Sequence, residues 1–118
     1  MKSTHAAYLP YIRRRRRLEQ ERMLARHERA QSAARMIADL LRRDFGAQEV
    51  IAFGSLVHAH RFGERSDIDL AVSGIAPRDF FRAWHAAGEG CPFEVDLVDI
   101  DDCSATLRSL IAEEGESL

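Results

Sequence analysis

The chain has 118 residues, of which 46% are hydrophobic and 31% are charged, with a formal net charge of −2. This length leaves room for one hydrophobic core, so we expect a single small domain and exclude a multidomain enzyme. No apolar run is long enough to span a membrane, the arginine-rich N-terminus lacks the apolar segment of a secretion signal, and the two cysteines form no C-x-x-C pair. These features favour a cytoplasmic protein with free thiols and no membrane partner.

The near-zero net charge hides an uneven distribution along the chain. Residues 1–45 contain twelve Lys and Arg against five Asp and Glu, whereas residues 46–118 contain five against fourteen. We therefore divide the single domain into a basic N-terminal tail and long helix (1–45), which packs on the core, and an acidic remainder (46–118).

The N-terminal part predicts a long helix that follows a frayed tail. Residues 1–11, punctuated by Pro10, are typical of a tail. Residues 12–45 are rich in helix-forming residues and contain no Gly or Pro, which predicts one long helix or two joined near residues 26–29. Only the second half has an apolar stripe at helical spacing with which to dock on a sheet. The stripe consists of Ala30, Ala34, Ile37, Leu41 and Phe45.

The run Arg13–Arg17 has two interpretations. It forms either a solvated helix start, with Glu19 and Glu21 as partners at helical spacing, or a contact with RNA or with an acidic protein surface. Five consecutive arginines point all around a helix instead of forming one stripe, which weakens the case for binding in a nucleic-acid groove.

The central stretch predicts two strands joined by a connecting segment. Residues 50–53 form a short apolar run that ends at Gly54, and residues 68–72 form a similar run. A glycine lets the backbone approach a ligand closely, and backbone N–H groups together with the Ser55 hydroxyl can hold phosphate oxygens. We expect one or two helical turns over residues 56–60 directly after this site.

Two aspartates lie at the head of the second strand. Asp67 and Asp69 are spaced i, i+2, so in a strand they project from the same face about 7 Å apart. Two carboxylates at this separation can share metal ions, and they repel each other without them.

The remaining sequence predicts a helix that begins at Pro77 and closes at Gly88, a third strand over 93–100, and a last helix over 104–114. On the third strand Glu94 and Asp96 share a face, so either is a candidate third carboxylate. Alternating strands and helices predict a compact α/β (α+β) fold, a sheet of three strands with helices on one side.

The arrangement of Gly54-Ser55, eleven further residues and then Asp67-Ile68-Asp69 resembles the signature of the nucleotidyltransferase superfamily that includes DNA polymerase β. It is most similar to the small stand-alone members called minimal nucleotidyltransferases (MNT), and the resemblance extends from about residue 45 to the C-terminus. It implies the nucleotidyltransferase fold, which is a small mixed β-sheet backed by helices, and a third carboxylate on a later strand. The family places an aspartate in a V-D-L-V context, which selects Asp96 over Glu94.

The resemblance also implies a chemistry. Asp67, Asp69 and Asp96 would be catalytic residues that hold two Mg²⁺ ions, while Gly54 and Ser55 cradle the triphosphate of ATP or another NTP. The expected reaction is the transfer of NMP, most simply AMP from ATP, to a hydroxyl acceptor.

Two further residues are candidates for binding the nucleotide. The family often carries Arg followed by Gly where this chain has His58 and Ala59, so His58 is expected to contact the phosphates in place of that Arg. Arg65, in the segment before the aspartates, is a second candidate for the same role.

The resemblance implies a partner as well. Similar minimal nucleotidyltransferases are commonly encoded with a small helical HEPN-type protein as toxin–antitoxin pairs, and in some pairs the enzyme adds AMP to a tyrosine of the toxin and silences it. One alternative is a non-catalytic antitoxin that neutralises its partner by complex formation, which the departure at His58 and Ala59 favours. Another is a nucleic-acid-binding module led by the basic run Arg13–Arg17.

Overall fold

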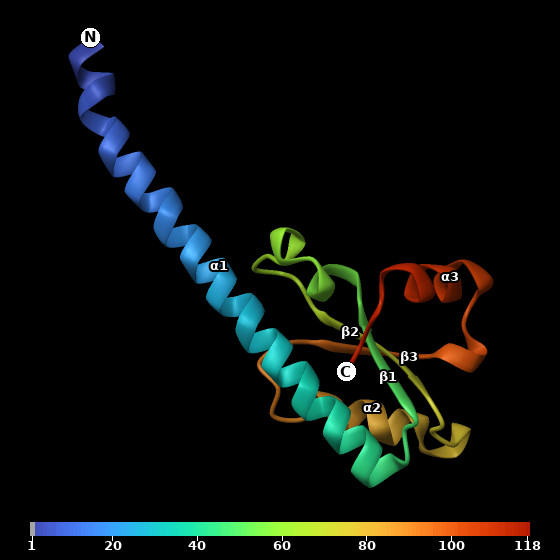
Figure 1. Cartoon of the computed structure of the whole chain (residues 1–118). Helices are drawn as coiled ribbons and strands as arrows, with labels where there is room; N and C mark the ends of the chain where they lie inside the picture. The colour runs from blue at the N-terminus through green and yellow to red at the C-terminus, as the bar shows by residue number, and fades with distance from the viewer. Residues whose placement is uncertain (1) are drawn as a thin grey trace.

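A computed structural model describes residues 2–118, and the side chains from residue 7 onward. Residues 2–118 form three helices and four strands, together with short 3-10 turns (Figure 1). In chain order the helices and strands are α1 Lys2–Phe45, β1 Glu49–Phe53, β2 Ile68–Ser73, α2 Phe80–Gly88, β3 Val95–Asp99, α3 Ala105–Glu114 and β4 Glu116–Ser117.

The strands form one mixed sheet in the order β3-β2-β1-β4. β1 pairs antiparallel with both β2 and β4, and β2 pairs parallel with β3. The three predicted strands and the mixed sheet are confirmed, but the sequence missed β4. This strand has two residues, too few for a periodic pattern, and the backbone of Leu118 extends it by donating a hydrogen bond of 2.9 Å to the Val50 carbonyl.

Helices cover both faces of the sheet, so the prediction that they lie on one side was wrong. The larger apolar cluster lies between the strands and the helices α1 and α2, whereas a second cluster of Phe53, Ala71 and Ile111 lies between the strands and α3. In Figure 1 α3 accordingly stands apart from α1 and α2. The physical reason is that β2 is apolar at successive positions, and a central strand of this kind needs cover on both faces.

α1 is a single helix, and its docking stripe is confirmed. Ala30, Ala34 and Leu41 are 0% exposed, and the chain leaves the helix at Gly46, whose φ is +74°. The first half extends away from the sheet (Figure 1), and every side chain from residue 7 to residue 22 is exposed. Arg15 pairs with Glu19 at 3.5 Å on this solvated surface.

The frayed tail that was predicted over residues 1–11 is helical from Lys2, so this prediction was wrong. The helix continues through Pro10, whose fixed φ suits a helix and whose main cost is one missing hydrogen bond. Among the helices of residues 2–118, none combines the length and the apolar composition that crossing a membrane requires. Cys91 and Cys103 are both free thiols, as expected.

Candidate carboxylate site

The sheet register brings the predicted carboxylates together. Asp69, the second residue of β2, lies opposite Phe53 of β1 on one side and opposite Asp96 of β3 on the other. Asp96, not Glu94, is thus the register partner of Asp69. Asp67 precedes the same strand by one residue, and Ile68 between the two aspartates is fully buried on the opposite face, which fixes the direction of both.

The pKa of Asp69 is shifted by its burial and by the neighbouring carboxylates. The pKa of Asp69 is raised from 3.8 to about 6, first by burial and then by the charges of Asp96 and Asp67. A half-buried carboxylate beside two others is unfavourable as an anion because it loses hydration and meets like charges. The cluster therefore concentrates negative potential at one point of the sheet.

Gly54 joins this cluster to the first strand. It follows β1 directly and has a φ of +72°, a conformation that L side chains rarely adopt. A Cβ at this position would lie 2.5 Å from Oδ2 of Asp69, so any other residue here would force the carboxylate to shift. Ser55 comes next, within the 3-10 turn Gly54–Val57, which begins the helical segment expected after the first strand.

The donor set suits a hard divalent cation. Three carboxylates supply the oxygen ligands that Mg²⁺ prefers, and a cation would relieve the repulsion that raises the pKa of Asp69. Within the described residues, no group of three or more His, Cys, Asp or Glu side chains is already gathered closely enough to hold a metal. The fit therefore rests on the chemistry of the donors and on their charge, and the metal-binding role of these aspartates stays a prediction.

The two other predicted nucleotide contacts, His58 and Arg65, lie in different surroundings. His58 turns toward α3, where its Nε2 lies 3.6 Å from Oε2 of Glu114, and this nitrogen is buried without a hydrogen-bond partner among the described residues. Arg65 is exposed in the turn before Asp67. Their contact with phosphates stays a prediction.

Sequence reasoning missed two residues of α1 that contact the segment between the strands. We call residues 54–67, which run from the glycine turn to the first aspartate, the connector. The imidazole of His27 donates from Nε2 to the Leu56 carbonyl at 2.6 Å, and Arg26 donates to the carbonyls of Gly63 and Glu64 at 3.2 and 2.9 Å. The available signal was the position of His27, three residues before Ala30, which continues the buried stripe with a polar side chain.

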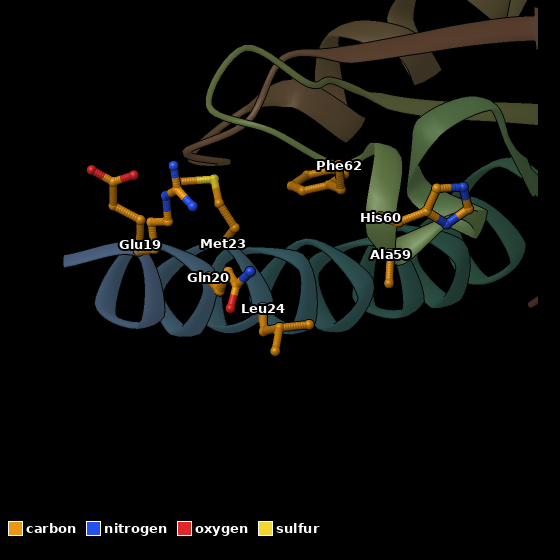
Figure 2. Close-up of a pocket in the computed structure, with 8 residues that line it drawn as sticks. Glu19, Gln20, Met23, Leu24, Ala59, His60 and Phe62 are labelled. Carbon is orange, nitrogen blue, oxygen red and sulfur yellow. The ribbon is translucent and has the colours of Figure 1, made fainter. Parts of the chain in front are cut away.

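A groove of about 630 Å³ runs between α1 and the connector. Figure 2 shows Met23 and Phe62 on the side of α1 that faces the connector, with Leu24 turned to the other side. The groove is separate from the carboxylates, and its lining residues are Arg16, Glu19, Gln20, Met23, Leu24, Ala59, His60 and Phe62.

No known family model matches this sequence, and no curated protein is significantly similar to it. The structure is nevertheless similar to solved structures of toxin–antitoxin complexes. A toxin–antitoxin complex with AMP-PNP matches with a TM-score of 0.62 and 25% identity, over 71% of this chain and 70% of that chain. A complex of a tri-AMPylated Shewanella oneidensis HEPN toxin with an MNT antitoxin matches with a TM-score of 0.58 and 24% identity, over 75% and 70%.

A further structure, the MntA–HepT toxin–antitoxin, matches with a TM-score of 0.57 and 24% identity, over 74% of this chain and 69% of that chain. These similarities confirm both the predicted fold class and the resemblance to minimal nucleotidyltransferase antitoxins that the Gly54-Ser55 and Asp67-Ile68-Asp69 motifs indicate.

Proposed function

We propose that this chain, which shares the fold of minimal nucleotidyltransferase antitoxins, is a metal-dependent nucleotidyltransferase that acts as an antitoxin. It transfers NMP, with ATP as the expected donor and AMP as the transferred group, to a hydroxyl of a HEPN-type toxin. The observation that carries the proposal is the close packing of the Asp69 carboxylate on Gly54, where an added Cβ would lie 2.5 Å from Oδ2, beside the charges of Asp96 and Asp67. Among similar structures, one contains AMP-PNP and another contains a tri-AMPylated HEPN toxin.

In this proposal the three aspartates and the glycine turn after β1 have separate roles. Asp67, Asp69 and Asp96 would hold two Mg²⁺ ions. When bound, such ions neutralise phosphate charge and lower the pKa of an attacking hydroxyl. The backbone at Gly54 and the hydroxyl of Ser55 bind triphosphate oxygens, since the absence of a Cβ lets the phosphates approach the carboxylates.

The reaction itself is a direct displacement. The oxygen of the acceptor hydroxyl forms a bond to the α-phosphorus, the bond from that phosphorus to the bridging oxygen breaks, and pyrophosphate leaves. As the new bond forms, the hydroxyl gives its proton to solvent water. Positioning and charge stabilisation supply most of the acceleration in such transfers. The fold contributes by holding the aspartate side chains in fixed directions.

The proposal is tested by incubating the chain with Mg²⁺, α-labelled ATP and a co-expressed HEPN-type partner, with intact mass as the readout. We expect the mass of AMP on the partner, and no transfer by Asp67→Asn or Asp69→Asn. The matched control is Asp102→Asn, which removes an exposed carboxylate outside the cluster and should leave transfer unchanged. Full transfer by either variant of the cluster would contradict the assignment.

The second candidate is an antitoxin that binds its partner without catalysis. It is favoured by His58, which lies at 3.6 Å from Glu114 on α3 and is followed by Ala59 where the family often has Gly. This candidate predicts stable partner binding and no transfer of any nucleotide. It also predicts that the triple replacement of Asp67, Asp69 and Asp96 by Asn leaves partner binding intact, whereas loss of neutralisation in that variant supports the enzyme.

A further inference from the structure

We propose that Arg26 and His27 are positioning residues of the nucleotide site, so that α1 is a working part of the site and not only a cover for the sheet. The inference rests on the proposed function, because it concerns the loop expected to hold the triphosphate. The two residues are adjacent on one helix, and they hold opposite ends of the connector.

His27 holds the end of the connector next to Ser55. Its side chain is buried, with a relative exposure of 7%, and its Nε2 lies 2.6 Å from the carbonyl oxygen of Leu56. A carbonyl only accepts, so Nε2 carries the hydrogen and donates it. The bond fixes the peptide between Leu56 and Val57, the second peptide after Ser55, and the imidazole also packs against Phe62 with ring centroids 5.3 Å apart.

Arg26 holds the other end, close to the aspartates. Its guanidinium donates from Nε to the Gly63 carbonyl and from Nη2 to the Glu64 carbonyl. The same group lies over the ring of Phe93, two residues before β3, with Cζ 4.7 Å from the centroid, a contact that helps to hold the guanidinium in place. The two carbonyls are three and four residues before Asp67, so their position limits where that aspartate can lie.

The connector needs such support because it has little regular structure of its own. Its helical content consists of two 3-10 turns, Gly54–Val57 and Ala59–Arg61, and short segments of this kind open easily. Phe62 of the connector packs on His27, and Figure 2 shows Phe62 on the same side of α1 as Met23. A loop that is ordered before the ligand arrives binds it with a smaller entropic cost.

The choice of residue at position 27 also points to positioning. The stripe of α1 continues with alanines and other apolar residues, which dock a helix at no polar cost. Burying an imidazole removes its hydrogen bonds to water. The single hydrogen bond to Leu56 only offsets that cost, so His27 adds little to the free energy of unfolding. What it adds is a defined location for the Leu56 carbonyl.

The test compares His27→Leu, which keeps the volume without the donor, with His27→Gln, which retains an N–H donor on a side chain of similar reach. Arg29→Gln is the matched control because Arg29 is an exposed residue of the same helix. Two quantities are measured on the full chain: amide hydrogen exchange over residues 55–66, and the affinity for AMP-PNP with Mg²⁺ by calorimetry. Exchange in β2 reports whether each variant is folded.

In His27→Leu we expect connector amides to exchange about tenfold faster and AMP-PNP to bind about tenfold more weakly, the loss that one buried hydrogen bond represents. His27→Gln should recover most of both losses, and Arg29→Gln should match the wild type. With transfer as a third readout, KM for the nucleotide should rise more than kcat falls. Arg26→Lys, which keeps the charge but not the two bonds, should behave like His27→Leu.

Unchanged exchange in His27→Leu would overturn the proposal, and so would faster exchange with unchanged affinity, because His27 would then serve only the packing of the connector. Failure of the proposed function gives a different result. If the wild type bound AMP-PNP but transferred nothing, the enzyme assignment would fall while the two readouts of positioning kept their meaning.

Discussion

The two faces of the sheet carry opposite kinds of residue on the same strand. On the face toward α1 and α2, Ile68 and Leu70 are completely buried and Val72 is 1% exposed. On the other face, Asp69 and Ala71 alternate with them, and α3 covers only the apolar part. Because side chains of a strand alternate between faces, one strand supplies both the core and the carboxylates. Burial of the apolar face therefore offsets the free-energy cost of placing carboxylates close together on the other face.

The largest effect is expected on the apolar face. Leu70→Ala removes a fully buried side chain from the centre of the core and leaves a cavity, which should lower the free energy of unfolding by about 2–5 kcal/mol. Urea denaturation followed by circular dichroism measures this loss. Leu110→Ala is the control, since Leu110 is 40% exposed and its truncation should cost far less.

The next largest effect is expected at Gly54, where the end of β1 lies against the Asp69 carboxylate. Gly54→Ala places a methyl group against Oδ2 of Asp69 and forces an L residue to a φ of +72°, so we expect a loss of roughly 2 kcal/mol. Combining it with Asp69→Ala should recover the steric part and leave the conformational part, which a double-mutant cycle separates. Gly63→Ala, with no atom within 4 Å of the added Cβ, is the control. Additive losses would show that the two residues do not touch.

The sequence predicted the carboxylate face better than the elements around it. The spacing of Asp67 and Asp69 in an alternating strand determines their common face, and this is a local property. The contacts of Arg26 and His27 join residues 29 to 38 positions apart, and no local pattern encodes them. The position of α3 on one face of the sheet and the pairing of β4 with β1 are likewise long-range arrangements, which form only once the sheet has assembled.

A smaller effect of opposite sign is expected at the carboxylate itself. Asp69→Asn removes a half-buried charge from a repulsive cluster, so without Mg²⁺ it should raise the free energy of unfolding at pH 7.5 by on the order of 1 kcal/mol, a figure discounted for solvent screening. This is the opposite of Leu70→Ala: truncating a side chain on the apolar face lowers the free energy of unfolding, whereas neutralising a carboxylate on the other face raises it.

The same residue gives a pH dependence with a defined sign. The pKa of Asp69 is about 6 in the folded chain and near 3.8 when unfolded, so between these values the folded state binds more protons. Its contribution to stability is present below pH 3.8 and is lost as the pH rises through 6. The advantage of Asp69→Asn should therefore shrink toward pH 4 in paired urea titrations. An advantage that does not change with pH would rule out this origin.

The smallest effect separates burial from charge within the cluster. Asp96→Asn removes one neighbouring charge, so the pKa of Asp69 should fall below 6 yet stay above 3.8, because burial is the largest cause of the shift. Asp67→Asn should lower the same pKa by less, since its charge is the smallest of the three causes. NMR titration of the Asp69 carboxyl carbon measures both. A return to 3.8 in Asp96→Asn would mean that repulsion, not burial by the sheet and its apolar cover, sets the proton affinity of this face.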